Sequence, residues 1–258
     1  MVDVIDLNSD LGEGFGRYTL GHDARLFEVV SSANIACGFH AGDPRTMQAS
    51  VHLAHENGVG IGAHPGFPDL AGFGRRELRV SHDEIVTDMI YQIGALAGFC
   101  QAAGVRLQHI KPHGALYNMA VREPAVAHAI ADAVARFDPT ALLFVLPNSV
   151  FEIAAHERNL RVVREIFADR AVEVDGSLVA RSKPGAVITD VQEVIARTIR
   201  MVRLGVVTAI TGEDISMSGE TICVHGDTPD AVELLQRLRS ALEDDGVRVQ
   251  PVGSWLTA

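Results

Sequence analysis

Short runs of β-branched and aliphatic residues alternate with helical patterns along the whole chain, and this alternation restricts the fold more than any other feature. The runs that we predict as strands lie at residues 2–7, 33–37, 59–63, 107–111, 141–146, 162–167 and 221–224. A strand, a helix and a further strand repeated about seven times predict right-handed crossovers and a parallel sheet. A closed or slightly open barrel fits this count, and so does a doubly wound sheet.

Boundary signals mark the helices between these runs. Asp43 precedes a proline, which predicts a helix start, and residues 81–84 (Ser-His-Asp-Glu) read as a capping box. We expect further helices to begin at residues 189–192 and at Thr228-Pro229. Residues 176–190 and 206–219 fit the repeat less well, and the second stretch reads as a hairpin. No linker or low-complexity segment divides the chain, so we predict a single β/α-barrel domain over residues 1–258.

Composition excludes several classes of protein. The chain has 22 basic and 33 acidic residues, a formal charge of −11, which argues against unaided binding of nucleic acid or of an anionic membrane. No apolar run approaches the roughly 18 residues that a membrane helix needs, and the start lacks the features of a secretory signal. The three cysteines show no CxxC spacing. We therefore expect a cytoplasmic protein; the charge tells little about a small anionic substrate, whose site can be locally positive.

Polar, glycine-containing turns follow almost every predicted strand. The carboxyl ends of parallel strands meet at one face of a β/α fold, so these turns should build one pocket. Histidines, carboxylates and a lysine there can supply the acid, base and electrophile that open an amide or ester. The residues that we expect to gather are Asp10, His40, His64, Lys111, His113, His225 and Asp227.

Structural roles compete with these functional ones. Asp43 and Asp227 are equally well placed as helix N-caps, and a histidine after a strand is often only a hydrogen-bonded loop residue. Cys37 and Cys223 end strands, where a small buried apolar side chain is the default. His40, His64 and Asp10 could bind a divalent metal, but the close HxxxH or HxH spacing is absent. No GxxxxGK[ST] motif occurs, so a P-loop does not hold ATP in this chain.

Seven segments, in order, resemble the LamB/YcsF family, which is associated with the A subunit of bacterial ATP-dependent 5-oxoprolinase. The resemblance covers almost the whole chain, and one departure is Val172, where we expect an aromatic residue. The segments are DLNSDLGE at 6–13, NIACGFHAGD at 34–43, GAHPGFPDL at 62–70, GFGRR at 72–76, KPHGALYN at 111–118, FADR at 167–170 and CVHGD at 223–227.

The resemblance implies a distorted seven-stranded parallel β/α barrel, similar to the glycoside hydrolase and deacetylase superfamily. It also implies hydrolysis of 5-oxo-L-proline to L-glutamate, coupled to cleavage of ATP to ADP and phosphate, together with partner subunits B and C. ATP would then be bound together with those partners. The resemblance leaves open whether a divalent metal is required.

We assign hypothetical roles on this basis. Asp10 and His64 would activate water, and His40 would act with Asp10 by proton transfer or through a metal. Lys111 and His113 would stabilise charge on the lactam oxygen or its phosphate. The remaining candidates are substrate-binding residues: Asn8, Asn34, Asp43, Arg75, Arg76, Tyr117, His225 and Asp227.

Two alternatives remain open from the sequence. The chain could be a stand-alone metal-dependent deacetylase or amidohydrolase, or a non-catalytic regulatory subunit that binds a lactam or carbohydrate. All catalytic readings predict that Asp10, His64 and Lys111 border one pocket.

Overall fold

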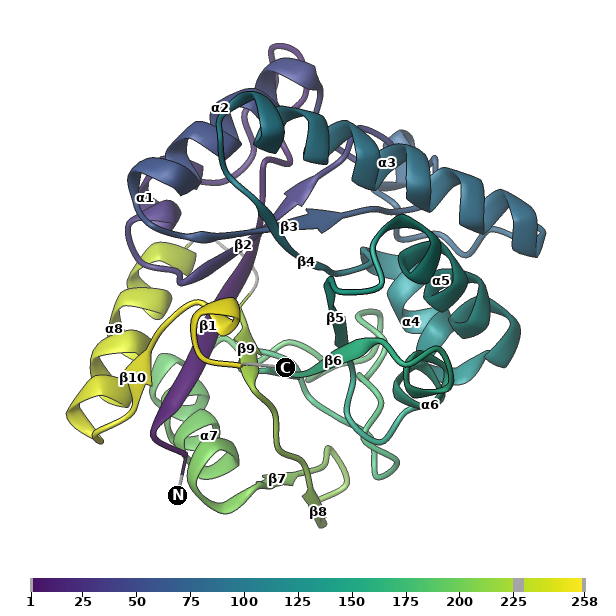
Figure 1. The fold of residues 1–258 in the computed structure, drawn as a ribbon. Helices are drawn as coiled ribbons and strands as arrows, with labels where there is room; N and C mark the ends of the chain where they lie inside the picture. Colours follow the sequence, from purple (N-terminus) through teal and green to yellow (C-terminus); the bar gives the residue numbers. More distant parts are fainter. Residues whose placement is uncertain (1, 225–229, 257–258) are drawn as a thin grey trace.

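Seven parallel strands form a closed barrel in a computed structural model of the protein, which describes residues 2–224 and 230–256. Each strand pairs with the next, and the last pairs with both β6 and β1 (Figure 1). A doubly wound sheet would leave two open edges, so the closure confirms the barrel. The strands are β1 (Val4–Leu11), β2 (Ser32–Ala36), β3 (Gly60–His64), β4 (Leu107–Ile110), β5 (Leu142–Val145), β6 (Arg161–Phe167) and β9 (Thr221–Cys223).

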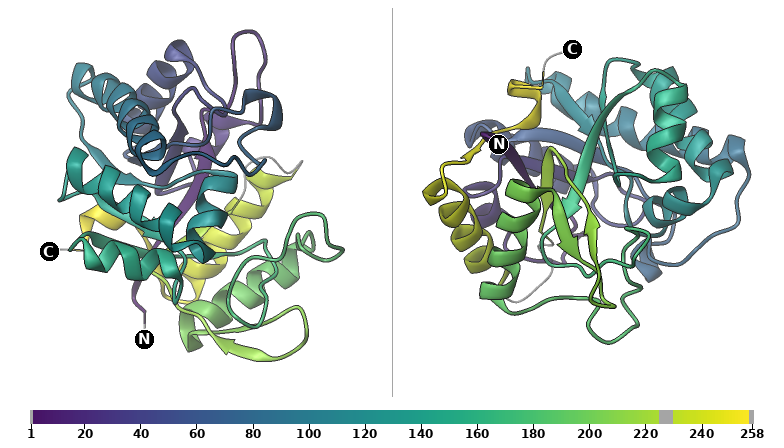
Figure 2. Two further views of the ribbon diagram at one scale, coloured as in Figure 1. Left: turned by 90° about the vertical axis from the view of Figure 1, so that its right-hand side faces the viewer. Right: turned by 90° about the horizontal axis from the view of Figure 1, so that it is seen from below.

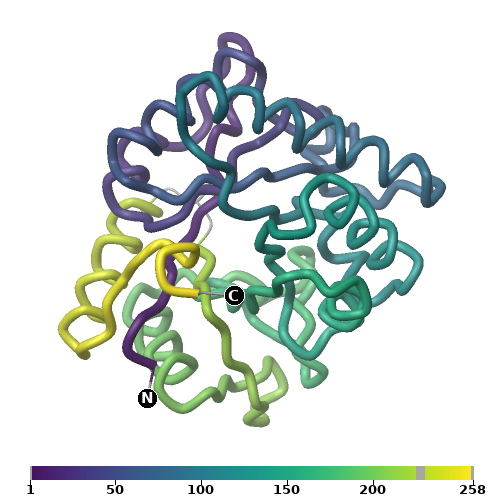
Figure 3. The backbone as a smooth tube through the Cα atoms, viewed as in Figure 1, coloured from purple at the N-terminus to yellow at the C-terminus, as the bar shows by residue number. Residues whose placement is uncertain are grey.

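Helices surround the strands on the outside of the barrel (Figures 1 and 2). The chain passes around the barrel in sequence order, so that its last elements lie beside its first (Figure 3). The α-helices are α1 (Asp23–Phe27), α2 (Pro44–Glu56), α3 (His82–Ala102), α4 (Gly114–Arg122), α5 (Pro124–Phe137), α6 (Val150–Glu157), α7 (Val191–Leu204) and α8 (Ala231–Asp244). Two 3-10 turns, η1 (Leu70–Gly72) and η2 (Val252–Ser254), complete the described helical elements.

The predicted boundary signals operate in the structure. Asp43 caps α2, and Ser81 and Glu84 form the capping box that opens α3. Asp190 caps α7 by accepting from the backbone N–H of Glu193. The start predicted at Thr228-Pro229 lies outside the described residues. Helix α8 faces the core with Val232, Leu235, Leu238 and Leu242, all buried.

Three local features differ from the predicted pattern or extend it. Strand β1 continues to Leu11, because its polar residues alternate into the barrel instead of ending the strand. A two-residue strand, β10 (Arg248–Val249), pairs in parallel with the start of β1 and was not predicted. The hairpin predicted within residues 206–219 is present as β7 (Val206–Thr208) and β8 (Asp214–Ser216).

One continuous cluster of buried apolar side chains extends from Ile5 to Val249. This continuity supports our proposal that the chain is one domain. No helix among residues 2–224 and 230–256 is long and apolar enough to cross a membrane.

Candidate functional site

A cavity of about 640 Å³ opens at the carboxyl ends of the barrel strands. Asp10, His64 and Lys111 all line it, although they come from β1, β3 and the turn after β4. His113 and Tyr117 line it as well. The expectation that strand-end residues distant in sequence border one pocket is therefore confirmed for these side chains.

Lys111 lies between two carboxylates at the floor of this cavity. Its Nζ is 2.9 Å from Asp10 Oδ1 and 2.9 Å from Glu165 Oε1, and only 4% of the side chain is exposed. Burial alone would lower the pKa of Lys111, but attraction by Asp10 and Glu165 holds it well above its ordinary value. Lys111 is therefore a permanent ammonium that faces the cavity.

Two donors hold the Asp10 carboxylate, and a histidine faces it. Its Oδ1 accepts from Lys111 and, at 2.9 Å, from the Asn34 amide, while its Oδ2 is 3.2 Å from His64 Nε2. Asn34 is in turn positioned by His109, whose Nε2 lies 2.7 Å from Asn34 Oδ1. These contacts orient the Asp10 carboxylate toward both His64 and Lys111.

Asn8 and Asn34 lie below the cavity, within the barrel interior. Both are fully buried, and the Asn34 amide also donates to Asn8 Oδ1 at 2.8 Å. The Asn8 amide donates to Thr221 Oγ1 at 2.7 Å, which ties β1 to β9. Their contacts support Asp10 and Lys111, and neither is among the residues that line the cavity.

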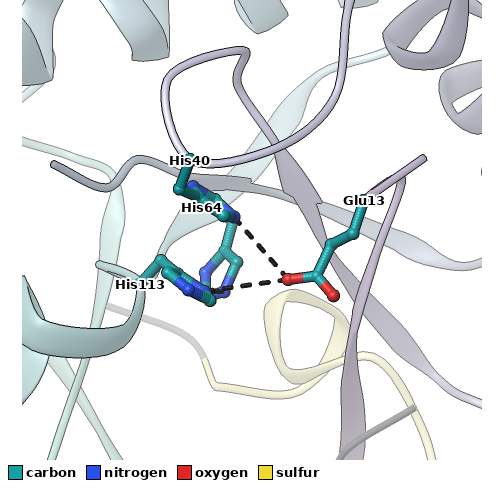
Figure 4. A group of neighbouring side chains, drawn as sticks. All are labelled: Glu13, His40, His64 and His113. Carbon is teal, nitrogen blue, oxygen red and sulfur yellow. Dashed lines mark hydrogen bonds and ion pairs between the residues drawn. The ribbon is translucent and has the colours of Figure 1, made fainter. Parts of the chain in front are cut away.

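Three histidines and a glutamate converge on one another (Figure 4). One of them, His64, also faces Asp10. Glu13, His40, His64 and His113 are buried, and each offers a ligand atom within 4.8 Å of the others. Glu13 Oε1 is 3.6 Å from His40 Nε2 and 3.7 Å from His113 Nδ1. Gly74, with φ +63°, allows this packing, since a Cβ there would lie 2.7 Å from His40 Cβ.

Hydrogen bonds to backbone carbonyls fix which ring nitrogens carry protons. His64 Nδ1 is 2.7 Å from the Lys111 carbonyl oxygen, and His113 Nε2 is 2.8 Å from that of Phe73, so both nitrogens donate. The other nitrogens, His64 Nε2 and His113 Nδ1, then face each other at 2.9 Å with their lone pairs. Two acceptors at this distance require a proton or a cation between them.

The donor set therefore fits a metal ion. Imidazole nitrogens oriented by backbone carbonyls, together with one carboxylate, are typical ligands of zinc and related divalent metals. Burial first, and then neighbouring charges, hold the pKa of His40 and His113 well below the ordinary value, which favours the neutral form that binds metals. Within the part of the chain that the structure describes, both ring nitrogens of His40 lack hydrogen-bond partners.

His40 is deeper than the sequence analysis implied. It is fully buried, stacks on His113 with ring centroids 3.7 Å apart, and is not among the cavity-lining residues. Its carboxylate contact is Glu13. The metal-binding set that the geometry favours thus contains Glu13 and His113 with His40 and His64, whereas Asp10 pairs with Lys111 and His64.

The other predicted binding residues are distributed differently. Arg75 and Tyr117 line the cavity, and Tyr117 is 4% exposed. Arg76 pairs instead with Asp69 and is not among the lining residues. Asp43 caps α2, accepts from Gly16 N and borders a separate surface hollow. His225 and Asp227 lie outside the described residues, and the substrate-binding roles of the whole group stay predictions.

Sequence reasoning missed three buried polar residues. Glu13 was overlooked although it stands in the turn after β1, and Glu165 and His109 were overlooked because they lie inside predicted strands. A charged residue at an inward position of an otherwise apolar strand is the signal that could have identified Glu165.

Cys223 is a buried thiol 3.1 Å from Lys111 Nζ, and burial raises its pKa well above the ordinary value, so it is an inert thiol.

His109 gives a prediction for stability against pH. Burial first, and then the charge of Lys111, hold its pKa well below 6.5 in the folded protein, whereas the unfolded chain titrates near the ordinary value. Between these pKa values the unfolded state binds the extra proton, so folding stability falls as pH drops below about 6.5. Wild type should lose about 1.4 kcal/mol more per pH unit than His109→Gln between about pH 6.5 and 5. Denaturant titrations of both proteins at several pH values measure this difference.

The difference between wild type and His109→Gln removes the effect of other groups that titrate in the same pH range. Asp6, with a pKa raised to about 6 mainly by burial, changes stability in the opposite direction as the pH falls from about 6. Its contribution is the same in both proteins and cancels in the difference. Equal slopes for wild type and His109→Gln would show that His109 does not titrate as described.

Comparison with known proteins places the whole chain in one group of sequences. The model of the LamB/YcsF family matches residues 5–257. A Symbiobacterium thermophilum protein, named as the A subunit of 5-oxoprolinase, is 52% identical over 250 residues, 97% of this chain and 96% of the relative. A protein of Pyrococcus abyssi with the same name is 51% identical over 252 residues, 98% and 99% of the two chains.

Solved structures agree with this grouping. The lactam utilization protein from Thermus thermophilus is 49% identical and superposes with a TM-score of 0.91, covering 96% of this chain and 99% of that one. The catalytic domain of a peptidoglycan N-acetylglucosamine deacetylase from Eubacterium rectale superposes with a TM-score of 0.51 at 11% identity, covering 97% and 89%. The second likeness concerns the fold alone.

Proposed function

Because the chain belongs to the LamB/YcsF family, we propose that it is the lactam-opening subunit of an ATP-dependent 5-oxoprolinase. The reaction converts 5-oxo-L-proline, ATP and water to L-glutamate, ADP and phosphate. The observation that carries the proposal is the placement of the Asp10 carboxylate between Lys111 and His64 at the wall of a cavity. A base, a fixed cation and room for a small ligand are the elements that hydrolysis of an amide requires.

ATP makes the opening of a stable lactam feasible. Phosphorylation of the amide oxygen by ATP, with release of ADP and of the N–H proton, gives a C5=N bond. Water then adds to this bond, with its hydroxyl on C5 and a proton on the nitrogen. The C5–N bond then breaks, the hydroxyl proton passes to the ring nitrogen, and an acyl phosphate remains. A second water releases phosphate and leaves the side-chain carboxylate of glutamate. This chain would carry out the water-addition steps.

The cavity residues fit defined roles in those steps. Asp10, oriented by Asn34 and Lys111, would accept the proton of the attacking water, with His64 beside it at 3.2 Å. Lys111 would stabilise negative charge that develops on the oxygen at C5. Arg75, which lines the cavity, would bind the ring carboxylate.

The partners are part of this proposal. The relatives are named as A subunits, which supports action within a multi-subunit complex. This chain has no P-loop, so ATP would be held with subunits B and C, in the cytoplasm where ATP is supplied. The isolated chain should therefore bind 5-oxo-L-proline but should not hydrolyse ATP.

That division of labour can be tested on the purified chain. Calorimetric titration with 5-oxo-L-proline should give saturable binding that Arg75→Gln weakens, and ADP release from ATP should stay at background. Robust ATP hydrolysis by the single chain would overturn the assignment of ATP to the partners. Absence of lactam binding at millimolar concentrations would contradict the proposed substrate.

We propose in addition that Glu13, His40, His64 and His113 hold a divalent metal. A bound divalent metal would supply a Lewis acid beside Asp10. The support is the donor set described above, in which two unprotonated imidazole nitrogens face each other.

Metal binding should be visible in thermal stability. At a Zn²⁺ concentration about 100 times the dissociation constant, wild type should gain about 2.7 kcal/mol of unfolding free energy, and Glu13→Gln should lose most of that gain. Melting curves with and without Zn²⁺, and metal content by mass spectrometry, measure the effect. Glu28→Gln, on an exposed residue, is the matched control and should respond as wild type does. An equal response of Glu13→Gln would exclude this metal site.

A second candidate function is a metal-dependent deacetylase or amidohydrolase that acts alone. The buried Glu13 and histidine cluster is the observation that favours it, since such ligands activate water in hydrolases. Acetate release from N-acetylated sugars by the single chain, abolished by a chelator and independent of ATP, would support it.

A third reading, a regulatory subunit that only binds a lactam or carbohydrate, would require unchanged complex activity after substitution of Asp10 and Lys111.

A further inference from the structure

The candidate cavity has a basic region that the proposed water-activating residues do not use. Arg170 and Arg181 line it together with Arg75. These three guanidinium groups come from different parts of the chain and meet at one cavity in a protein with a formal charge of −11.

Carboxylates line the cavity too, but Asp10 already pairs with Lys111 and Glu77 with Arg122. The remaining guanidinium groups outnumber the remaining carboxylate, Asp175, so an anionic ligand would balance their charge.

Of Arg170 and Arg181, Arg170 is the buried one. It is 4% exposed, its Nε donates to the Ala186 carbonyl at 3.2 Å, and its Nη2 donates to the Val179 carbonyl at 2.6 Å. These bonds anchor the segment between residues 179 and 186, which carries Arg181. Desolvation first, and then repulsion by Arg181, lower the pKa of Arg170 to about 10, so it stays charged at neutral pH.

Arg181 is exposed at the cavity rim. Within residues 2–224 and 230–256 it has no hydrogen bond or ion pair. Two carboxylates line the same cavity and have other partners: Glu77 pairs with Arg122, and Asp175 accepts from Ser177. The Arg181 guanidinium is thus available to a ligand in the cavity, on a segment that Arg170 fixes.

The cavity is also larger than the lactam requires. Its volume of about 640 Å³ lies within the range of roughly 300–1,000 Å³ that accommodates drug-sized ligands, whereas 5-oxoproline is a single five-membered ring with one carboxylate. The N-terminus of α6 borders the same cavity through Ser149 and Val150, which adds partial positive charge. Space and positive charge are therefore present beyond what the ring and its carboxylate need.

We infer that Arg170 and Arg181 form a phosphoryl subsite that receives the phosphate of the phosphorylated lactam, while Arg75 binds its carboxylate. This inference rests on the proposed function. The Arg181 guanidinium can bind phosphate oxygens through paired hydrogen bonds, which a lysine cannot do. Arg170, whose Nε and Nη2 donate to backbone carbonyls, would contribute its charge and its Nη1 donor. The subsite would let the chain discriminate between the activated lactam and free 5-oxoproline.

Inorganic phosphate is the probe that tests the subsite. Calorimetric titration of the purified full chain should give saturable binding at millimolar concentrations or below, and Arg181→Gln should weaken it by about 10-fold to 100-fold. Arg17→Gln removes the same charge from an exposed position on the separate hollow and should change the affinity less than about twofold. Arg181→Lys should retain intermediate affinity, because it keeps the charge but loses the fork.

A parallel titration separates this inference from the proposed function. Arg181→Gln should bind 5-oxo-L-proline as wild type does. If wild type itself does not bind 5-oxo-L-proline, the proposed function is contradicted, whereas the phosphate result is unaffected. No phosphate binding by wild type at about 10 mM, or equal binding by Arg181→Gln, would overturn the subsite. ATP that binds far more tightly than phosphate and loses affinity in Arg181→Gln would overturn the assignment to a phosphorylated lactam, because the site would then hold a nucleotide.

Discussion

Replacing Lys111 with alanine should lower turnover of the assembled complex by about 10²–10³. Loss of one preorganised donor to a developing oxyanion has an effect of this size. Lys111 Nζ is the cation that faces Asp10 and Glu165 at 2.9 Å each. Lys111→Arg should also be poor, since a planar fork does not fit between two carboxylates spaced for a compact ammonium. Steady-state formation of glutamate from 5-oxoproline measures both variants.

The structure also predicts a loss of stability, which needs its own control. Removing the ammonium leaves Asp10 and Glu165 without their shared counter-charge, at a cost of roughly 3–5 kcal/mol. The double variant Lys111→Met with Glu165→Gln removes one charge of each sign and should recover much of the melting temperature, but not the turnover. Lys183→Ala, at the other lysine of the chain, should leave turnover within about twofold. Full turnover in Lys111→Ala would reject the electrostatic role.

Asp10→Asn should reduce glutamate formation by about 10²–10⁴, because the amide cannot accept the proton of water. The side chain keeps its size, and its oxygen can still accept from the Asn34 amide and from Lys111, so binding of 5-oxo-L-proline should persist. Turnover and lactam affinity should therefore separate. Measuring both on the same preparation shows whether the carboxylate acts in the chemistry or only in binding.

Asp138→Asn provides the matched control. Asp138 precedes β5 at the opposite end of the barrel, where it accepts from Thr140, so the same chemical change there should leave turnover unaltered. An Asp10→Asn complex that retains more than about a tenth of wild-type turnover would assign the general base to another group.

Much of the fold could be predicted from the sequence, because each barrel strand is a separate β-branched run with a helix signal after it. The end of β1 could not, since Asn8, Ser9 and Asp10 look like a loop until the closed barrel supplies partners such as Thr221 and Asn34. Strand β10 has only two residues, and its pairing depends on the return of α8 to the start of β1.

The sequence predicted which residues gather at the candidate site better than it predicted which of them are in contact. The topology brings the strand ends together, which is why Asp10, His64 and Lys111 meet at one cavity. The pairing of Lys111 with Glu165 joins the turn after β4 to β6, past β5, and no local pattern encodes such a contact.

The histidine cluster shows the same limit. The sequence suggested Asp10 with His40 and His64, whereas Glu13 and His113 complete the group in the structure. The reason lies in the turn after β1, where Gly12 has φ +69° and redirects the chain. A backbone rotation of that kind decides which carboxylate faces the histidines, and residue order does not reveal it.

The central claim, that this chain opens the lactam within a complex, is tested most directly by omission from a reconstituted reaction. Partner subunits B and C should be incubated with 5-oxo-L-proline and ATP, with and without this chain, and glutamate and ADP measured in each case. The account predicts glutamate only when the chain is present, and none when Asp10→Asn replaces it beyond a small residual rate. Equal glutamate formation without the chain would contradict the account.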